Sequence, residues 1–224
     1  MLLQLTLITL LSAAAGTSRG ADDFDALVTS FEEEHNAWQA RLDEIEDLRE
    51  RGALRKAHPA SGFWERFRAC GEGGEGRAWL WMIEHVGEAG VARKERAGVK
   101  SDLYERLFSG HAGADWFGDV IRRVPRDARD LGGEFVEAKL TPLMGADEAQ
   151  TAGLATLTLG SILAGSKDEA VSERGEELLE AYEEKYISVG AQAIDFTGTT
   201  FEGHEFKLSD YKGKVVLLDF YGFW

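Results

Sequence analysis

The sequence predicts a mainly α protein, with a helical domain over residues 22–187 and the first strands of an α/β domain over residues 188–224. Three observations predict this fold class. Between residues 22 and 187, apolar residues recur three and four positions apart, the spacing of one helix face. At Ile187 this spacing gives way to short extended stretches separated by glycine. The last stretch, Val215–Leu218, is an unbroken apolar run rich in β-branched residues, which is typical of a buried strand.

Residues 1–20 are predicted to be a signal peptide rather than part of the fold. Leu2–Leu11 is mostly apolar, Ser12–Gly16 supplies small residues for cleavage, and the first charged residue is Arg19. The apolar run is too short to span a membrane. We therefore expect an exported protein, periplasmic or extracellular, with no stable membrane insertion after cleavage.

The composition indicates that the chain can form a globular core, and it excludes some classes of partner. Of the 224 residues, 44% are hydrophobic, which is enough to bury a core in one or two domains. The net charge of −15 argues against nucleic acid or an anionic membrane surface as a partner, because both are polyanions.

The first part of the helical domain is predicted to contain one long helix and two shorter ones. The long helix covers residues 22–56, with acidic residues at its start and basic residues at its end, and His58-Pro59 breaks it. Ser61 is placed to cap a short helix, and Gly71–Gly76 is expected to be a flexible loop rather than a phosphate loop. Residues 77–86 are apolar almost all round, which predicts a buried helix.

The second part is predicted to contain four or five helices joined by short loops, so that neighbours pack as antiparallel pairs. Ser101-Asp102 and Asp115 are expected to cap the first two, and Pro125 to end the second. The others lie around residues 135–140, 147–163 and 167–186, and no fixed repeat length relates them.

The C-terminal residues are predicted to form strands and turns. Phe196–Phe201 and Glu205–Lys207 are expected to pair as a hairpin that turns at Glu202-Gly203. A short turn from Leu208 to Gly213 follows, and then the buried strand Val215–Leu218. Asp219 interrupts the apolar run near its C-terminal end, where open α/β sheets place their chemistry.

The stretch from residue 187 to 224 resembles the thioredoxin-like superfamily, in particular redoxins of the AhpC/TSA and TlpA-like type. Gly190–Phe196 is similar to the Gly-x-x-Ala-Pro-Asp-Phe opening of these domains, with Ile194 in place of the proline. Glu202–Phe206 resembles their hairpin, and Leu208–Lys214 the turn before their central strand. Tyr221–Trp224 resembles the aromatic residues that directly precede the family's Cys-x-x-Cys.

This resemblance implies that the reactive residue of a full-length form follows Trp224, at a helix N-terminus that stabilises a thiolate or selenolate. Tyr221, Gly222, Phe223 and Trp224 are then the residues flanking the active site, and none of them is itself catalytic. The chain as given is expected to be a truncated and inactive version. A UGA codon that encodes selenocysteine would explain the position of the break; a cloning boundary and a degenerate gene are the competing explanations.

Three functions follow from these observations. The first is a TlpA-like thiol–disulfide oxidoreductase acting on protein disulfides, the second a peroxiredoxin-like peroxide reductase, and the third a non-enzymatic helical binding or scaffold protein.

No cofactor is predicted. No metal site is predicted either, because the histidines form no cluster in sequence and only His85 beside Glu84 and His111 near Asp115 make weak pairs. Cys70, the one cysteine, is expected to be a half-buried helical residue, with a thiol made reactive by Arg66 and Arg68 as the alternative.

Overall fold

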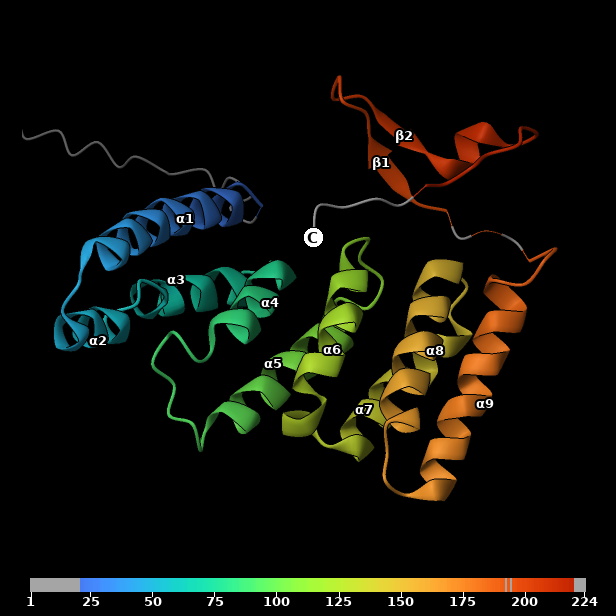
Figure 1. The fold of residues 1–224 in the computed structure, drawn as a ribbon, viewed down its shortest axis with the longest axis horizontal. Coiled ribbons are helices and arrows are strands. Elements are labelled where there is room, and N and C mark those ends of the chain that lie inside the picture. Colours follow the sequence, from blue (N-terminus) through green and yellow to red (C-terminus); the bar gives the residue numbers. More distant parts are fainter. Residues whose placement is uncertain (1–20, 192, 194, 220–224) are drawn as a thin grey trace, which may run out of the picture. The chain divides into compact units, whose positions relative to one another are not determined.

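The computed structural model describes residues 21–191, 193 and 195–219 and divides into two compact units between Val99 and Lys100. Most of the described chain is helical, as predicted (Figure 1). In chain order the α-helices of the described residues are α1 (Ala21–Glu44), α2 (Leu48–Lys56), α3 (Ala60–Glu72), α4 (Gly76–His85), α5 (Arg96–Gly110), α6 (Phe117–Leu131), α7 (Gly133–Leu140), α8 (Ala149–Ala164) and α9 (Glu169–Tyr186). Two short 3-10 helices, η1 (Pro142–Gly145) and η2 (Leu208–Tyr211), and two strands, β1 (Thr197–Thr199) and β2 (Glu205–Lys207), complete the described elements.

The first unit has an aromatic core between α1, α3 and α4. The ring of Phe67 on α3 stacks on Trp81 of α4 with 3.7 Å between centroids, and Phe31 of α1 meets Trp81 edge-on at 5.0 Å. Gly71 lets α3 approach α4, because a Cβ at this position would lie 2.6 Å from Cδ2 of Trp79. The prediction that residues 77–86 form a buried helix is confirmed, since Trp79, Met82 and Ile83 are buried on α4.

The prediction of a single helix over residues 22–56 is wrong, because the chain breaks between α1 and α2. Asp47 causes the new start: its carboxylate accepts hydrogen bonds from the backbone N–H groups of Arg49 and Glu50 at 2.9 and 2.8 Å. These bonds satisfy donors that a helix N-terminus leaves without partners. No residue of α2 is buried, so packing does not force this segment to continue α1.

Other predicted boundaries also differ from the structure. Ser61 lies inside α3 instead of capping it, and Trp116 rather than Asp115 holds the cap position of α6. Helix α3 continues to Glu72, so Gly71 is helical and the loop before α4 is shorter than predicted. Helix α5 begins at Arg96, ahead of the Ser101-Asp102 pair. Pro125 lies inside α6 instead of ending it. The buried residues on both sides of Pro125, among them Ile121 and Asp127, fix this helix to the core, and that packing outweighs a cost of about 3 kcal/mol for an interior proline.

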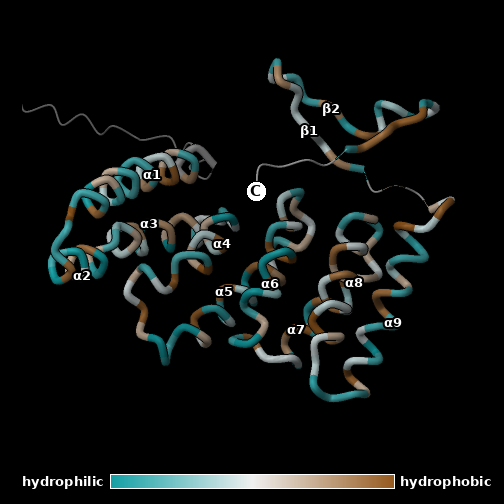
Figure 2. Tube along the Cα trace, in the orientation of Figure 1, coloured by the Kyte–Doolittle hydropathy of each residue, from teal (hydrophilic) through white to brown (hydrophobic). Residues whose placement is uncertain are grey.

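In the second unit, nine of the 16 residues of α8 are buried, and α9 covers one side of this helix (Figure 1). Figure 2 shows hydrophilic and hydrophobic residues alternating along α9, as expected for a helix with one face on a neighbour and one face in water. The two helices touch at glycines. A Cβ at Gly175 of α9 would overlap the backbone nitrogen of Ala164 and lie 2.7 Å from its Cα.

The predicted hairpin is confirmed. Strands β1 and β2 pair antiparallel, with Gly198 opposite Phe206, and Gly203 adopts a φ of +83° in the turn between them. The expected short turn after β2 is the 3-10 helix η2. The prediction of a buried strand at Val215–Leu218 is wrong: these residues lie in no strand, and Val215 and Leu217 are fully or almost fully exposed. A strand needs a partner for its N–H and C=O groups, and in the described part of the chain none pairs with this run.

Candidate functional site

Residues 195–211, part of the stretch that resembles the redoxins, are held together locally by hydrogen bonds from backbone N–H groups. The Asp195 carboxylate accepts a hydrogen bond from the backbone N–H of Ser209 at 2.8 Å, which joins the residues just before β1 to η2. The N–H of Leu208 donates to the carbonyl of Phe196 at 3.0 Å. Hydrogen bonds from Ser209, with a smaller contribution from the charge of Lys207, lower the pKa of Asp195 below its ordinary value. The carboxylate is therefore an anchor for the turn.

The four residues predicted to flank the active site, Tyr221, Gly222, Phe223 and Trp224, lie outside the described residues. Gln192 and Ile194 of the opening motif lie outside them as well. Asp219, the last described residue, is exposed and belongs to no strand. The structure therefore describes the hairpin and the turn of the redoxin-like stretch, and the role of its aromatic residues stays a prediction.

Cys70 is half-buried on α3, as predicted for a helical cysteine. It lines a surface hollow of about 390 Å³ between α1 and α3, together with Arg66, Ser30 and small apolar residues. The two arginines singled out from the sequence have other contacts. The Arg66 guanidinium lies over the Phe63 ring at 4.6 Å, and Arg68 pairs with Glu65 at 3.2 Å.

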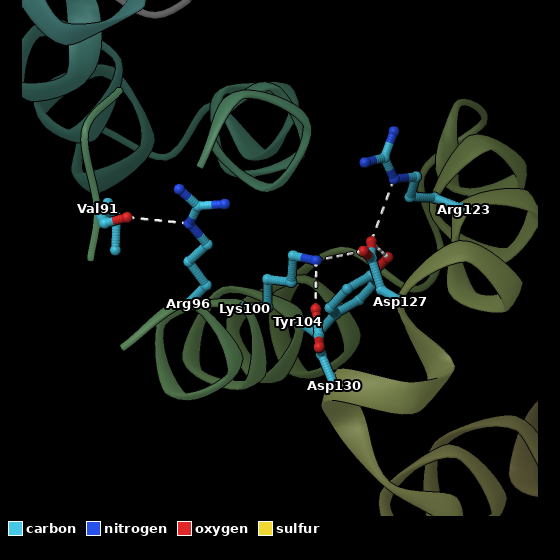
Figure 3. A network of polar contacts seen from close by, with 7 residues as sticks. All are labelled: Val91, Arg96, Lys100, Tyr104, Arg123, Asp127 and Asp130. Atoms are coloured by element: carbon cyan, nitrogen blue, oxygen red, sulfur yellow. Dashed lines mark hydrogen bonds and ion pairs between the residues drawn. The ribbon is translucent and has the colours of Figure 1, made fainter. Parts of the chain in front are cut away.

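A buried carboxylate with three donors, which the sequence did not reveal, lies between α5 and α6 (Figure 3). Asp127 is 2% exposed and accepts hydrogen bonds from Nζ of Lys100 at 2.6 Å, the hydroxyl of Tyr104 at 3.0 Å and Nε of Arg123 at 3.1 Å. Lys100 also donates to Asp130 at 2.6 Å. Burial alone would lower the pKa of Lys100, but these two carboxylates outweigh it and raise the pKa above its ordinary value.

This network is suited to holding helices rather than to catalysis. Each donor points at a carboxylate, and Asp127 itself is closed off from solvent. A charge in this position stays buried only because its partners satisfy it. The sequence carried no signal for this site, because the predicted helix ended at Pro125; only the fold shows that α6 continues and that Asp127 faces inward.

Three histidines that are far apart in sequence come together in the first unit. The rings of His35 and His58 lie 5.2 Å apart, and Nε2 of both His58 and His85 lies 4.0 Å from Glu88. The predicted pairing of His85 with its neighbour Glu84 missed this arrangement, while His111 packs near Trp116 at 5.7 Å between ring centroids. In the residues that the structure describes, no group of three His, Cys, Asp or Glu side chains has the geometry to hold a metal ion. None of the described helices is long and apolar enough to cross a membrane.

Two curated proteins are similar to part of the chain. The thiol-disulfide oxidoreductase ResA of Geobacillus kaustophilus is 50% identical over 42 residues, and ResA of Geobacillus thermodenitrificans is 45% identical over 42 residues. Each match covers 19% of this chain and 24% of the relative, so the chain spans about a quarter of the length of these proteins. No protein-family model matches the chain, and no solved structure matches it significantly. One stretch of the chain is thus similar to a thiol–disulfide oxidoreductase of the thioredoxin-like, redoxin type.

Proposed function

We propose that the full-length form of this protein is a thiol–disulfide oxidoreductase of the thioredoxin-like class. The observation that carries the proposal is the 50% identity with ResA over 42 residues. The hairpin β1–β2 and the turn η2 fit it, because they lie where the sequence motifs of the redoxin opening predict them. The names of both relatives favour a disulfide as the substrate over a peroxide.

The proposed chemistry is exchange between a thiol pair and a disulfide. A thiolate or selenolate that follows Trp224 attacks one sulfur of a protein disulfide, forms a mixed disulfide and expels the other sulfur as a thiolate. A second cysteine then attacks the mixed disulfide and releases the reduced substrate. Tyr221–Trp224 would pack beside the nucleophile and limit the access of water. Cys70 has no part in this cycle, because both reactive residues of the proposed pair follow Trp224.

We also propose that the protein is exported, because residues 2–16 have the apolar run and the small residues of a signal peptide. An exported location suits dithiol exchange with protein disulfides, which persist outside the cytosol. N-terminal sequencing of the protein from its natural source tests this, since cleavage should remove about 15 to 20 residues.

Peptide mapping and an activity assay test the proposed function together. The protein is isolated from its natural source, and the peptide containing Tyr221–Trp224 is sequenced by mass spectrometry. We expect this peptide to continue into a Cys-x-x-Cys or a selenocysteine-x-x-Cys. The protein should then reduce insulin disulfides, and the variant Cys70→Ser made from the natural gene should keep this activity. A peptide that ends at Trp224, an inactive protein, or activity lost in Cys70→Ser would contradict the proposal.

A further inference from the structure

The histidine cluster of the first unit joins three parts of its fold. His35 comes from α1, His58 from the turn between α2 and α3, and His85 from the end of α4. His58 lies at the centre: its ring packs edge-on against Trp38 of α1 at 4.5 Å, and its side chain is 7% exposed. Glu88, which follows α4, is the carboxylate that faces it.

His58 also holds the start of α3. The backbone N–H of Ala60 donates a hydrogen bond to Nδ1 of His58 at 3.2 Å, and the residue at the cap position, Pro59, has no side-chain group to do so. A ring nitrogen accepts a hydrogen bond only when it carries no proton. The ring is therefore neutral, with its proton on Nε2, the nitrogen that faces Glu88 at 4.0 Å.

Protonation would remove this contact. The added proton goes to Nδ1, which turns the acceptor into a donor that points at the N–H of Ala60. It also places a positive charge at the N-terminus of α3, where the helix dipole repels it. Burial lowers the pKa of His58 below the ordinary value of 6.5, His35 and His85 lower it further, and only Glu88 opposes them.

We propose that His58 is a pH-sensitive latch, which in its neutral form fixes the first turn of α3 against α1 and α4 and which releases that turn when the ring is protonated. The direction follows from the lowered pKa of His58. The unfolded chain takes up the proton near pH 6.5 and the folded chain only at lower pH, so stability falls as the pH drops below about 6.5. Above that pH the latch contributes fully. For one proton the folded-to-unfolded ratio changes by at most about tenfold per pH unit.

An NMR titration of the full chain tests the coupling directly. The ring signals of His58 and the backbone amide signal of Ala60 are followed from about pH 7.5 to about pH 5, where histidines titrate. We expect the Ala60 amide to shift with the same midpoint as the His58 ring, and amides in the first turn of α3 to exchange faster below it than their intrinsic rates predict. A His58 ring that titrates while the Ala60 signal stays in place would overturn the proposal.

Variants separate His58 from other acid-sensitive groups. In His58→Asn, the amide oxygen lies close to the position of Nδ1 and accepts the same hydrogen bond, but it does not titrate. We expect the folded-to-unfolded ratio of this variant, measured by urea unfolding, to fall several-fold less between about pH 7 and about pH 5 than that of the natural chain. The control His204→Asn changes an exposed histidine of the hairpin and should keep the full pH dependence. Equal pH dependence in His58→Asn and the natural chain would overturn the proposal, and the NMR titration decides it without any variant.

Discussion

Asp127 illustrates how a charged residue becomes part of a core. Three donors from two helices converge on its carboxylate, so that burial leaves none of its negative charge unpaired. The donors differ in kind: an ammonium, a phenol and a guanidinium. Because each comes from a different turn of α5 or α6, the carboxylate fixes how these two helices meet.

We predict that Asp127→Ala destabilises the protein strongly, while Asp130→Ala does not. The first change leaves Lys100 and Arg123 partly buried without their shared carboxylate, which costs about 3–5 kcal/mol. The second removes a carboxylate that is 43% exposed and leaves the bond from Lys100 to Asp127 in place, so we expect less than about 1 kcal/mol. Urea unfolding followed by far-UV circular dichroism measures both. If the two variants lost the same free energy of unfolding, the network would not depend on the buried Asp127.

The contacts of single residues such as Asp127 could not be predicted from the sequence. Asp127 and Pro125 lie two positions apart, and the sequence predicted that the helix ends at Pro125, before Asp127 is reached. That prediction fails because the packing of α6 is decided by contacts with α5 and α8, whose residues are distant in sequence. The histidine cluster was missed for the same reason: His58 follows His35 by 23 positions, and His85 follows His58 by 27.

At the scale of elements, α8 and α9 pack through small residues. Gly160 of α8 and Gly175 of α9 face each other, since a Cβ at Gly160 would lie 3.2 Å from the carbonyl oxygen of Gly175. The hydroxyl of Ser172 donates to the carbonyl of Ala164 at 2.9 Å and ties the same crossing together. The helices approach closely because no side chain separates their backbones.

We predict that Gly175→Ala destabilises the second unit by about 2–3 kcal/mol, because the new methyl group meets the backbone of α8 rather than a movable side chain. The matched control is Gly52→Ala on α2, where nothing lies within 4 Å of the new Cβ. Alanine there should stabilise the helix by about 0.5–1 kcal/mol. Thermal unfolding measures both changes. If Gly175→Ala melted like the natural chain, the close crossing of α8 and α9 would not exist in solution.

Elements were predicted well in number and type where packing and local signals agree. The almost wholly apolar residues 77–86 predicted α4, the apolar spacing of residues 167–186 predicted α9, and the Glu202-Gly203 turn predicted the hairpin. Boundaries were missed where a local signal outweighs the spacing, as at Asp47, or where tertiary contacts outweigh the local signal, as at Pro125. Val215–Leu218 has the composition of a strand, but a strand also requires neighbours to pair with.

At the scale of the whole molecule, the buried residues of the described chain lie in the helices and the turns next to them. No described residue from Ser188 onward is buried, and large apolar side chains such as Val189, Phe201 and Leu217 are exposed. The hairpin closes on itself through the contact of Phe206 with Phe196 and Tyr211. A two-stranded hairpin of this size has little stability of its own.

The candidate site was predicted from motifs rather than from physical pattern. The redoxin-like stretch stands out because its glycines, its hairpin and its aromatic residues follow one another in a specific order, and the partial similarity to ResA agrees with that resemblance. The geometry of a reactive residue follows from the whole sheet and its covering helices, which motifs alone do not supply. The helical domain has no comparable motif, and its role could not be read from residues at helical spacing.

A shortened chain that ends at Ile187 tests how the fold is divided. We predict that it keeps the helical far-UV signal and the cooperative unfolding of the full chain, with a stability change below about 1 kcal/mol. The reason is that residues 188–219, where described, contribute no buried side chain, and surface changes cost little. The control is a chain that ends at Gly165 and lacks α9. It uncovers α8 residues such as Leu159 and Leu163, which are 2% and 5% exposed, and we expect it to lose several kcal/mol. If both shortened chains lost stability equally, the C-terminal stretch would pack on the helices in solution, and the helical domain would not end near residue 187.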